Sequence, residues 1–168
     1  DALHRASLDA LLPAHGLAAL EGGARADLTL AWHRLHPWPD SVAGLARLKR
    51  RVVIGTLSNG NVALLVNMAK FAALPWDVVL SAELFRHYKP DPETYDGAAA
   101  LLGLAPAQVM LVAAHNADLQ AARARGLATG FVPRPTEYGL AQSKDLRAEE
   151  AWDVVVPDFC ALAERMGA

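Results

Sequence analysis

Arg51-Val-Val-Ile-Gly-Thr-Leu-Ser-Asn-Gly60 is the most informative stretch of the chain. Its residues 52–57 form a short apolar run with several β-branched side chains, which is typical of a strand buried on both faces of a parallel sheet. The Ser-Asn-Gly sequence ends this run, and Asn61 is a suitable N-cap for residues 62–71, whose apolar positions have helical spacing. Such a strand–turn–helix junction places small polar groups at the carboxyl end of a parallel strand, where open α/β sheets bind ligands and free helix N–H groups favour an anion.

From residue 41 onward, segments of strand type alternate with segments of helix type. Strands are expected at residues 52–57, 77–81, 109–114, 128–132 and 153–156. Helices are expected at residues 41–50, 61–72, 92–103, 116–125 and 158–166, with a short helix or loop at 82–87 and a turn-rich loop at 133–142. Because helix-length segments separate the strands, the pattern predicts βα units and a parallel sheet with right-handed crossovers.

The amino-terminal region has a different, all-helical pattern. Leucines at positions 3, 8, 11 and 12 are expected to share one helix face, and Gly22-Gly23 is expected to form a turn before a second helix. The composition changes at His36-Pro-Trp-Pro-Asp40, where two prolines around a tryptophan make a stiff connector. We therefore expect a helical part at residues 1–36 and an α/β core at residues 37–168.

Overall composition narrows the class of protein. The 168 residues are 53% hydrophobic, which is sufficient for a packed core, and the formal net charge of −2 without a basic stripe argues against a nucleic-acid partner. No apolar run approaches the roughly 20 residues of a membrane span, and charged residues interrupt the amino end where a signal peptide would be apolar. Cys160 is the single cysteine, so no intrachain disulfide or thiolate metal cluster is expected. A cytoplasmic protein without a membrane partner fits these features best.

Three polar clusters follow the expected strand or loop ends: Ser58-Asn59, Lys89-Pro90-Asp91 and His115-Asn116-Ala117-Asp118. In a parallel sheet the first and third lie at the same carboxyl edge, and the second can reach that crevice from its loop. A hydroxyl, an amide, an ammonium and a carboxylate that converge there suit a small anionic substrate, with the carboxylate able to orient or deprotonate water.

Each cluster by itself also has a structural interpretation. Ser-Asn-Gly is a common turn, and a lysine before Pro-Asp often lies in solvent at a helix entry. Asp118 matches the dipole of a helix start, and a lone His115 is more often an ordinary core or surface residue. The order and position of the three clusters together favour the functional interpretation.

The same segments resemble a known family. Leu57-Ser-Asn-Gly60, Tyr88-Lys-Pro-Asp-Pro92 and Val112-Ala-Ala-His-Asn-Ala-Asp-Leu119 resemble motifs two, three and four of the haloacid dehalogenase superfamily. Segments 37–40, 89–95 and 131–139 resemble its L-2-haloacid dehalogenase branch in particular. The resemblance implies an α/β fold with a HAD-like Rossmannoid parallel sheet and a helical cap, of which residues 1–36 would be a part.

The resemblance also implies roles for individual residues. Ser58 would bind the substrate carboxylate, and Asn59 would hold that carboxylate or the departing halide. Lys89 would pair with a nucleophilic aspartate and keep it ionised, Tyr95 would support the region around this lysine, and Asp118 would position the network and the hydrolytic water.

Three further positions depart from the pattern of the branch. His115 stands where the branch has a polar residue, often asparagine, that faces the nucleophile and the substrate. Ala113 and Ala117 stand where some members carry serine and tryptophan. The resemblance therefore implies the reaction more firmly than the choice of substrate.

The first motif of the family, Asp-x-x-x-Thr on a central strand, has no counterpart in residues 1–168. We expect the strand that carries it to lie between the strands ending at Ser58 and at Ala114, and to be absent from this chain. The chain alone is accordingly expected to be inactive, because covalent catalysis by a carboxylate needs that residue.

The leading functional expectation is therefore hydrolysis of short 2-haloacids to 2-hydroxyacids by the parent protein, through an aspartyl ester, without a metal or other cofactor. A homodimer is expected from the resemblance alone. One alternative is a magnesium-dependent phosphatase of the same superfamily, although Ala114 replaces the first acid of the phosphatase Gly-Asp-x-x-x-Asp pattern. Another alternative is a non-catalytic fragment or interaction module.

Overall fold

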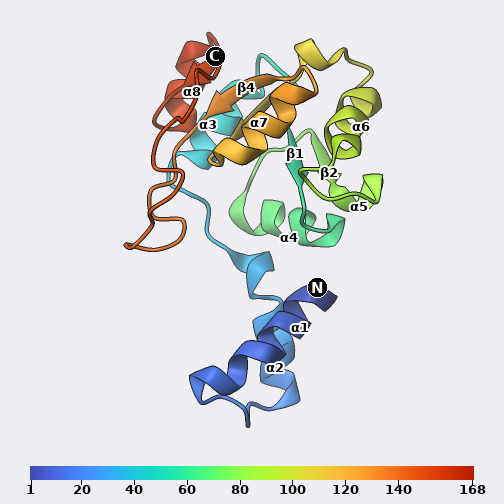
Figure 1. The fold of residues 1–168 in the computed structure, drawn as a ribbon, viewed down its shortest axis with the longest axis vertical. Coiled ribbons are helices and arrows are strands. Elements are labelled where there is room, and N and C mark those ends of the chain that lie inside the picture. The colour runs from blue at the N-terminus through green and yellow to red at the C-terminus, as the bar shows by residue number, and fades with distance from the viewer.

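Five short parallel strands form two separate sheets in the α/β part of the structure, a computed structural model that describes residues 1–168 (Figure 1). The first sheet pairs β1 (Gly55–Ser58) with β2 (Val78–Ser81), with Ser58 opposite Ser81. The second sheet has the order β3-β4-β5, built from β3 (Met110–Ala113), β4 (Ala128–Phe131) and β5 (Val154–Val155). The predicted α/β fold with parallel strands is confirmed.

Helices connect the strands and cover both faces of the sheets. They are α3 (Ser41–Leu48), α4 (Val62–Ala72), α5 (Ala82–Phe85), α6 (Pro92–Leu102), η3 (Pro106–Gln108), α7 (Asn116–Ala124) and α8 (Phe159–Arg165). None of the helices combines the length and the hydropathy that crossing a membrane requires.

The core lies in two clusters on opposite faces of the second sheet. Leu111 belongs to a cluster with Phe131 and Leu119 of α7, whereas its neighbour Val112 packs against the cluster formed by α3 and α8. Consecutive residues of a strand point to opposite faces, so β3 contributes one side chain to each cluster. This arrangement fixes β3 from both sides.

The first strand is shorter than the sequence predicts. We expected residues 52–57 to be buried on both faces, but β1 begins at Gly55 and Val53 is 66% exposed. The cause is local, because the N–H of Val52 donates to the carbonyl of Leu48 at 3.0 Å and continues the turn that ends α3. The extended segment therefore begins only after that turn.

Residues 1–36 form a small helical unit that lies on the far side of α4 from the sheets (Figure 1). It contains α1 (Ala2–Leu11), η1 (Leu12–His15), α2 (Gly22–Thr29) and η2 (Ala31–Arg34). Buried His33 joins the unit to α4 through Nδ1, which lies 2.9 Å from Nδ2 of Asn67.

Two details of this helical unit differ from prediction. Gly22 and Gly23 are the first two residues of α2 rather than a turn, since the break in the chain precedes them and Glu21 is the extended N-cap. The leucines expected to share one face also differ in exposure, since Leu12 is buried whereas Leu3 and Leu11 are exposed.

The Pro-Trp-Pro-Asp connector is fixed to the core by a largely buried ion pair. Both carboxylate oxygens of Asp40 lie 2.9 Å from the guanidinium of Arg134, and one of them also accepts the N–H of Phe159 at 2.8 Å. The guanidinium lies 5.0 Å from the centre of the Trp38 ring. One arginine thus joins the connector, the loop after β4 and the start of α8.

Helices α3 and α8 approach each other at backbone distance. A Cβ at Gly44 would lie 2.5 Å from both the backbone carbon and the Cβ of Phe159, closer than atoms can pack. Glycine is therefore required at this crossing.

The substitution Gly44→Ala tests this contact. We expect it to lower the free energy of unfolding by about 1–3 kcal/mol, because a backbone must shift to accept the methyl group. Gly23→Ala is the matched control in a helix with no atom within 4 Å, and we expect it to raise stability by about 0.5–1 kcal/mol. Urea unfolding measures both, and equal effects at the two positions would contradict the close approach.

The Asp40–Arg134 pair predicts a dependence of stability on pH. Burial acts to raise the pKa of Asp40, but hydrogen bonds from Arg134 and from the Phe159 N–H outweigh it and hold this pKa below its ordinary value. A lowered pKa stabilises the fold above the unfolded value of about 4, and this stabilisation is lost as the pH falls through the folded value.

We expect Arg134→Leu to cost about 3 kcal/mol at neutral pH, the lower end for a buried pair, because it leaves a largely buried carboxylate without its charged partner. The variant should also lose less stability than wild type on acidification, since protonation of Asp40 no longer breaks the pair. Arg125→Leu, which removes an exposed pair with Asp96, is the control and should cost no more than about 1 kcal/mol. Urea titrations at a series of pH values would contradict the assignment if the two variants behaved alike.

Candidate active site

A groove separates the two sheets and runs between β1 and β3. In the structure β1 pairs with β2 and β3 pairs with β4, so the two strands face each other across the groove without hydrogen bonds between them. The groove has a volume of about 730 Å³ and is lined mainly by apolar side chains of these strands and of the helices around them. Two facing strand edges with apolar walls have the shape and chemistry of a slot for a further strand.

The polar side chains of the groove gather where β1 and β3 end. Ser58 is the last residue of β1, and His115 and Asp118 follow β3 at the start of α7. Lys89 lines the same groove from the loop that precedes α6. The three polar clusters predicted from the sequence therefore each contribute a residue to one end of one cavity.

Lys89, Asp118 and Tyr95 form the most enclosed part of this end. The ammonium of Lys89 donates to Oδ2 of Asp118, and the hydroxyl of Tyr95 donates to Oδ1 at 2.7 Å. Only 19% of the Lys89 side chain and 12% of the Asp118 side chain are exposed, so solvent screens the pair weakly. Asp118 also lies in the first turn of α7, where the helix dipole favours a negative charge.

Tyr95 supports this pair from a fully buried position on α6. Burial, together with the hydrogen bond to the negative Asp118, raises the pKa of the Tyr95 hydroxyl and keeps it protonated. Because the hydroxyl proton is used in the hydrogen bond to Asp118, Tyr95 positions that carboxylate and does not donate to a ligand in the open part of the groove.

Asn59 holds the lysine loop through the backbone of Lys89. Its side-chain oxygen accepts the N–H of Lys89 at 2.7 Å, and its side-chain nitrogen donates to the Lys89 carbonyl at 3.1 Å. The amide therefore fixes the point from which the lysine side chain extends. This pairing joins the turn after β1 to the loop before α6.

Ser58 lies within a tightly bonded turn. Its Oγ accepts the N–H of Gly60 at 3.0 Å, and the Gly60 carbonyl accepts a hydrogen bond from Ser81 Oγ at 2.6 Å. Since Ser58 Oγ acts as an acceptor in the turn, its own proton is left for a ligand in the groove. The backbone N–H of Gly60 thus holds the Ser58 oxygen in place, and the hydroxyl proton remains available to donate a hydrogen bond to a ligand.

Asn61 is the N-cap residue of α4, as predicted, but its side chain makes no capping hydrogen bond. Instead, Oε2 of Glu83 accepts the N–H of Val62 at 3.0 Å. The predicted N-cap position is therefore confirmed, and the capping hydrogen bond comes from a carboxylate distant in sequence.

His115 has a carboxylate partner that the sequence does not reveal. Its Nε2 lies 2.9 Å from Oε2 of Glu137 and 3.3 Å from the hydroxyl of Tyr138, both in the loop that follows β4. Lys144 lies over the Tyr138 ring, with Nζ 4.5 Å from its centre. These contacts depend on the path of a long loop, for which a local sequence pattern gives no signal.

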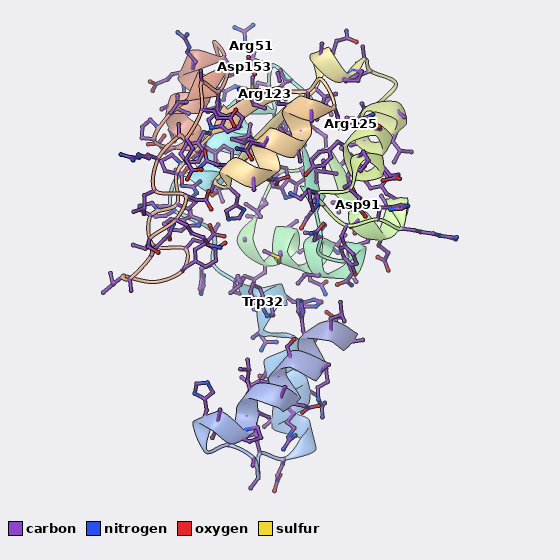
Figure 2. All side chains as sticks on the ribbon, viewed as in Figure 1. Trp32, Arg51, Asp91, Arg123, Arg125 and Asp153 are labelled. Carbon is purple, nitrogen blue, oxygen red and sulfur yellow. The ribbon has the colours of Figure 1, made fainter.

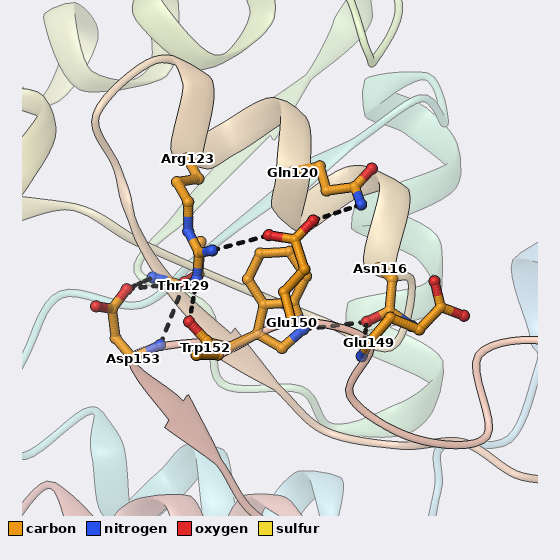
Figure 3. Close-up of polar contacts among 9 residues, drawn as sticks. Asn116, Gln120, Arg123, Thr129, Glu149, Glu150, Trp152 and Asp153 are labelled. Atoms are coloured by element: carbon orange, nitrogen blue, oxygen red, sulfur yellow. Dashed lines mark hydrogen bonds and ion pairs between the residues drawn. The ribbon is translucent and has the colours of Figure 1, made fainter.

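The start of α7 is held by the buried side chain of Asn116. Its Oδ1 accepts hydrogen bonds from the Trp152 indole and the Glu149 N–H, both at 3.0 Å (Figure 3). Arg123, about two helical turns further along α7, lies 4.2 Å from the Trp152 ring centre and pairs with Glu150. This network fixes α7, and with it the positions of His115 and Asp118.

One group of side chains outside the groove has the spacing of metal ligands. His87, Asp91 and Glu93 place ligand atoms within 4.8 Å of one another, but all three are exposed. Asp91 lies beside α5 on the outer side of the core (Figure 2), and none of the three lines the groove. Exposed acidic groups of this kind are ordinary surface features, and no hydrogen bond or ion pair joins them to the side chains of Lys89 and Asp118.

Comparisons with known proteins agree with this geometry. The model of the haloacid dehalogenase-like hydrolase family matches residues 2–126. The chain is 32% identical over 151 residues to an (S)-2-haloacid dehalogenase of Xanthobacter autotrophicus, a match that covers 80% of this chain and 58% of that protein. It is 34% identical over 128 residues to (S)-2-haloacid dehalogenase 4A of Burkholderia cepacia, covering 73% of this chain and 55% of that protein. The chain thus spans little more than half the length of these curated relatives.

Solved structures give the same result. The L-2-haloacid dehalogenase PA0810 matches with a TM-score of 0.95 and 52% identity over 98% of this chain and 70% of that chain. The Xanthobacter autotrophicus enzyme, in a structure with chloropropionic acid covalently bound, matches with a TM-score of 0.81 and 28% identity over 98% of this chain and 74% of that chain. The chain therefore belongs to the haloacid dehalogenase-like hydrolases and, within them, to the L-2-haloacid dehalogenase branch.

Proposed function

We propose that the complete protein hydrolyses short 2-haloacids to 2-hydroxyacids and halide through a covalent aspartyl ester. The observation that carries the proposal is the groove between β1 and β3, whose polar end presents Ser58 and the Lys89–Asp118 pair. The names of the relatives, and the covalently bound chloropropionic acid in one of them, support the same reaction class.

The proposal places a further strand in the groove. A strand between β1 and β3 would satisfy both facing edges and join the two sheets into one. An aspartate at the carboxyl end of that strand would lie beside Lys89, whose positive charge favours the ionised, nucleophilic form. Residues 37–168 are then the α/β core without this strand, and residues 1–36 are part of a cap.

The chemistry divides into two displacements. In the first, a carboxylate oxygen attacks C2 of the substrate while the carbon–halogen bond breaks, and the halide leaves with the electron pair, with inversion at carbon expected. In the second, water adds to the ester carbonyl and releases the 2-hydroxyacid. A negatively charged substrate requires donors at the open part of the groove, and Ser58 is placed to supply one.

The remaining polar residues hold the reacting groups in position. Asn59 fixes the Lys89 backbone, and Tyr95 fixes the carboxylate of Asp118. We assign both as positioning residues, although the resemblance implied that Asn59 contacts the substrate carboxylate or the halide. Holding a charged lysine and a carboxylate in one geometry lowers the reorganisation needed during the reaction.

The phosphatase alternative is less well supported by the side chains present. Magnesium is held in proteins mainly by carboxylate and carbonyl oxygens, but Ala114 lines the groove where the phosphatase pattern has its first acid. Both oxygens of Asp118 already accept hydrogen bonds from Lys89 and Tyr95. The donor set therefore favours displacement at carbon.

Two further features belong to the proposal. A homodimer is expected from the resemblance to the branch alone, because the rest of the cap would also cover the apolar side chains exposed on the helical unit, among them Leu3, Leu11 and Trp32, which lies where this unit approaches the core (Figure 2). A cytoplasmic location is supported by Cys160, which is the single cysteine and is free.

The first functional prediction compares the complete protein with residues 1–168 alone. We expect the complete protein to release halide from L-2-chloropropionate and the isolated chain to release none, because the nucleophile lies outside the chain. Halide and phosphate release, each with and without magnesium, are measured on both samples. Halide release by residues 1–168 alone would contradict the placement of the nucleophile, and dominant magnesium-dependent phosphate release by the complete protein would replace the proposed reaction.

The second functional prediction concerns Lys89. We expect Lys89→Met in the complete protein to lower kcat/KM for halide release by at least about 100-fold, because it removes the charge that stabilises the reacting carboxylate. Lys70→Met, at an exposed position on α4, is the matched control and should behave as wild type. Circular dichroism verifies that both variants fold, and a folded Lys89→Met protein with normal kcat/KM would contradict the role.

A further inference from the structure

His115 carries an unassigned chemical feature at the polar end of the groove. A carboxylate can only accept hydrogen bonds, so the 2.9 Å contact with Glu137 requires that Nε2 of His115 carries the proton in the neutral ring. The other ring nitrogen, Nδ1, then has a lone pair, and no hydrogen bond of the structure uses it. Glu137 therefore selects the neutral tautomer in which Nδ1 is the nitrogen that can accept a proton.

The position of His115 places its side chain within the candidate site. His115 is the N-cap residue of α7, three positions before Asp118, and it lines the groove together with Ser58 and Lys89. Its side chain is 39% exposed, so water reaches the ring from the open side. A residue with access to both solvent and the groove is suited to act on a water molecule.

Asp118, the other candidate base, is already engaged. Its two oxygens accept hydrogen bonds from an ammonium and from a phenol, so a water molecule must compete with both donors for the carboxylate. The Nδ1 atom of His115 meets no such competition. The two groups therefore have different roles. Asp118 holds Lys89, and His115 is available for proton transfer.

We propose that His115, oriented by Glu137, is the general base for the hydrolytic water in the second half of the reaction. The inference rests on the proposed function, because it needs the aspartyl ester as its substrate. Glu137 is a positioning residue in this scheme, since it touches the imidazole and not the reacting atoms. The charged and titratable groups around the ring are Glu137 and Tyr138 from the loop, with Lys144 beyond Tyr138, and Lys89 and Asp118 from the groove.

Both protons of the attacking water are accounted for in this step. Nδ1 takes a proton from water as the water oxygen bonds to the ester carbonyl carbon, which gives a tetrahedral intermediate and an imidazolium paired with Glu137. The bond from that carbon to the substrate oxygen then breaks, and the departing alkoxide takes the proton back from Nδ1. The products are the 2-hydroxyacid and the aspartic acid, which loses its own proton to solvent before the next turnover.

The test uses His115→Ala in the complete protein with L-2-chloropropionate. We expect ester formation to persist and ester hydrolysis to slow, so kcat should fall by about 100-fold or more while kcat/KM stays near the wild-type value. Halide should appear as a burst of one equivalent per site, and intact-protein mass spectrometry should detect the accumulated ester. His15→Ala, at an exposed histidine of the helical unit, is the matched control and should turn over normally.

Two further variants keep the outcome decisive. Glu137→Gln retains an acceptor for Nε2 without the charge, so we expect a smaller fall in kcat with the same preserved kcat/KM. His115→Gln replaces the alanine variant if that protein does not fold. Wild-type protein that releases no halide would overturn the proposed function itself. A folded His115 variant with normal kcat, or with reduced kcat/KM and no accumulated ester, would overturn only the role of His115.

Discussion

The ion pair between Lys89 and Asp118 is the constraint on which the candidate site depends. Two charges that are largely removed from water are costly unless each has good partners, and here Tyr95 supplies the additional hydrogen bond to the carboxylate. The pair joins the loop before α6 to the first turn of α7, so it fixes two sides of the groove relative to each other. A lysine held in this way presents its charge at one fixed point of the cavity.

The rest of the core maintains that geometry through backbone contacts. Asn59 holds the Lys89 main chain, and Asn116 holds the start of α7 through its bonds to Trp152 and Glu149. Neither asparagine needs to touch a ligand for the site to depend on it. The polar side chains of the three sequence clusters thus have two different roles. Some face the cavity, and others hold the backbone in position.

Residues close in sequence allowed the fold and much of the candidate site to be predicted. The alternation of strands and helices predicted a parallel α/β fold, and the positions of Ser58, Lys89 and Asp118 after strands and loops predicted that they would gather at one edge. Contacts over long sequence separations could not be predicted this way. The Glu137 partner of His115 comes from a loop 22 residues away, and the Glu83 cap of α4 comes from 21 residues away. The prediction that the first strand begins at residue 52 was wrong. Apolar character alone does not reveal that the N–H of Val52 still donates to the carbonyl of Leu48 at the end of α3.

The central claim is that a carboxylate from outside residues 1–168 enters the groove and attacks the substrate beside Lys89. Its most direct test is a single turnover of the complete protein in heavy-oxygen water, followed by mass mapping of its peptides. Ester hydrolysis at the enzyme carboxyl would place one heavy oxygen on an aspartate in a segment outside residues 1–168. Heavy oxygen on Asp118, or on no carboxylate of the protein, would contradict the account.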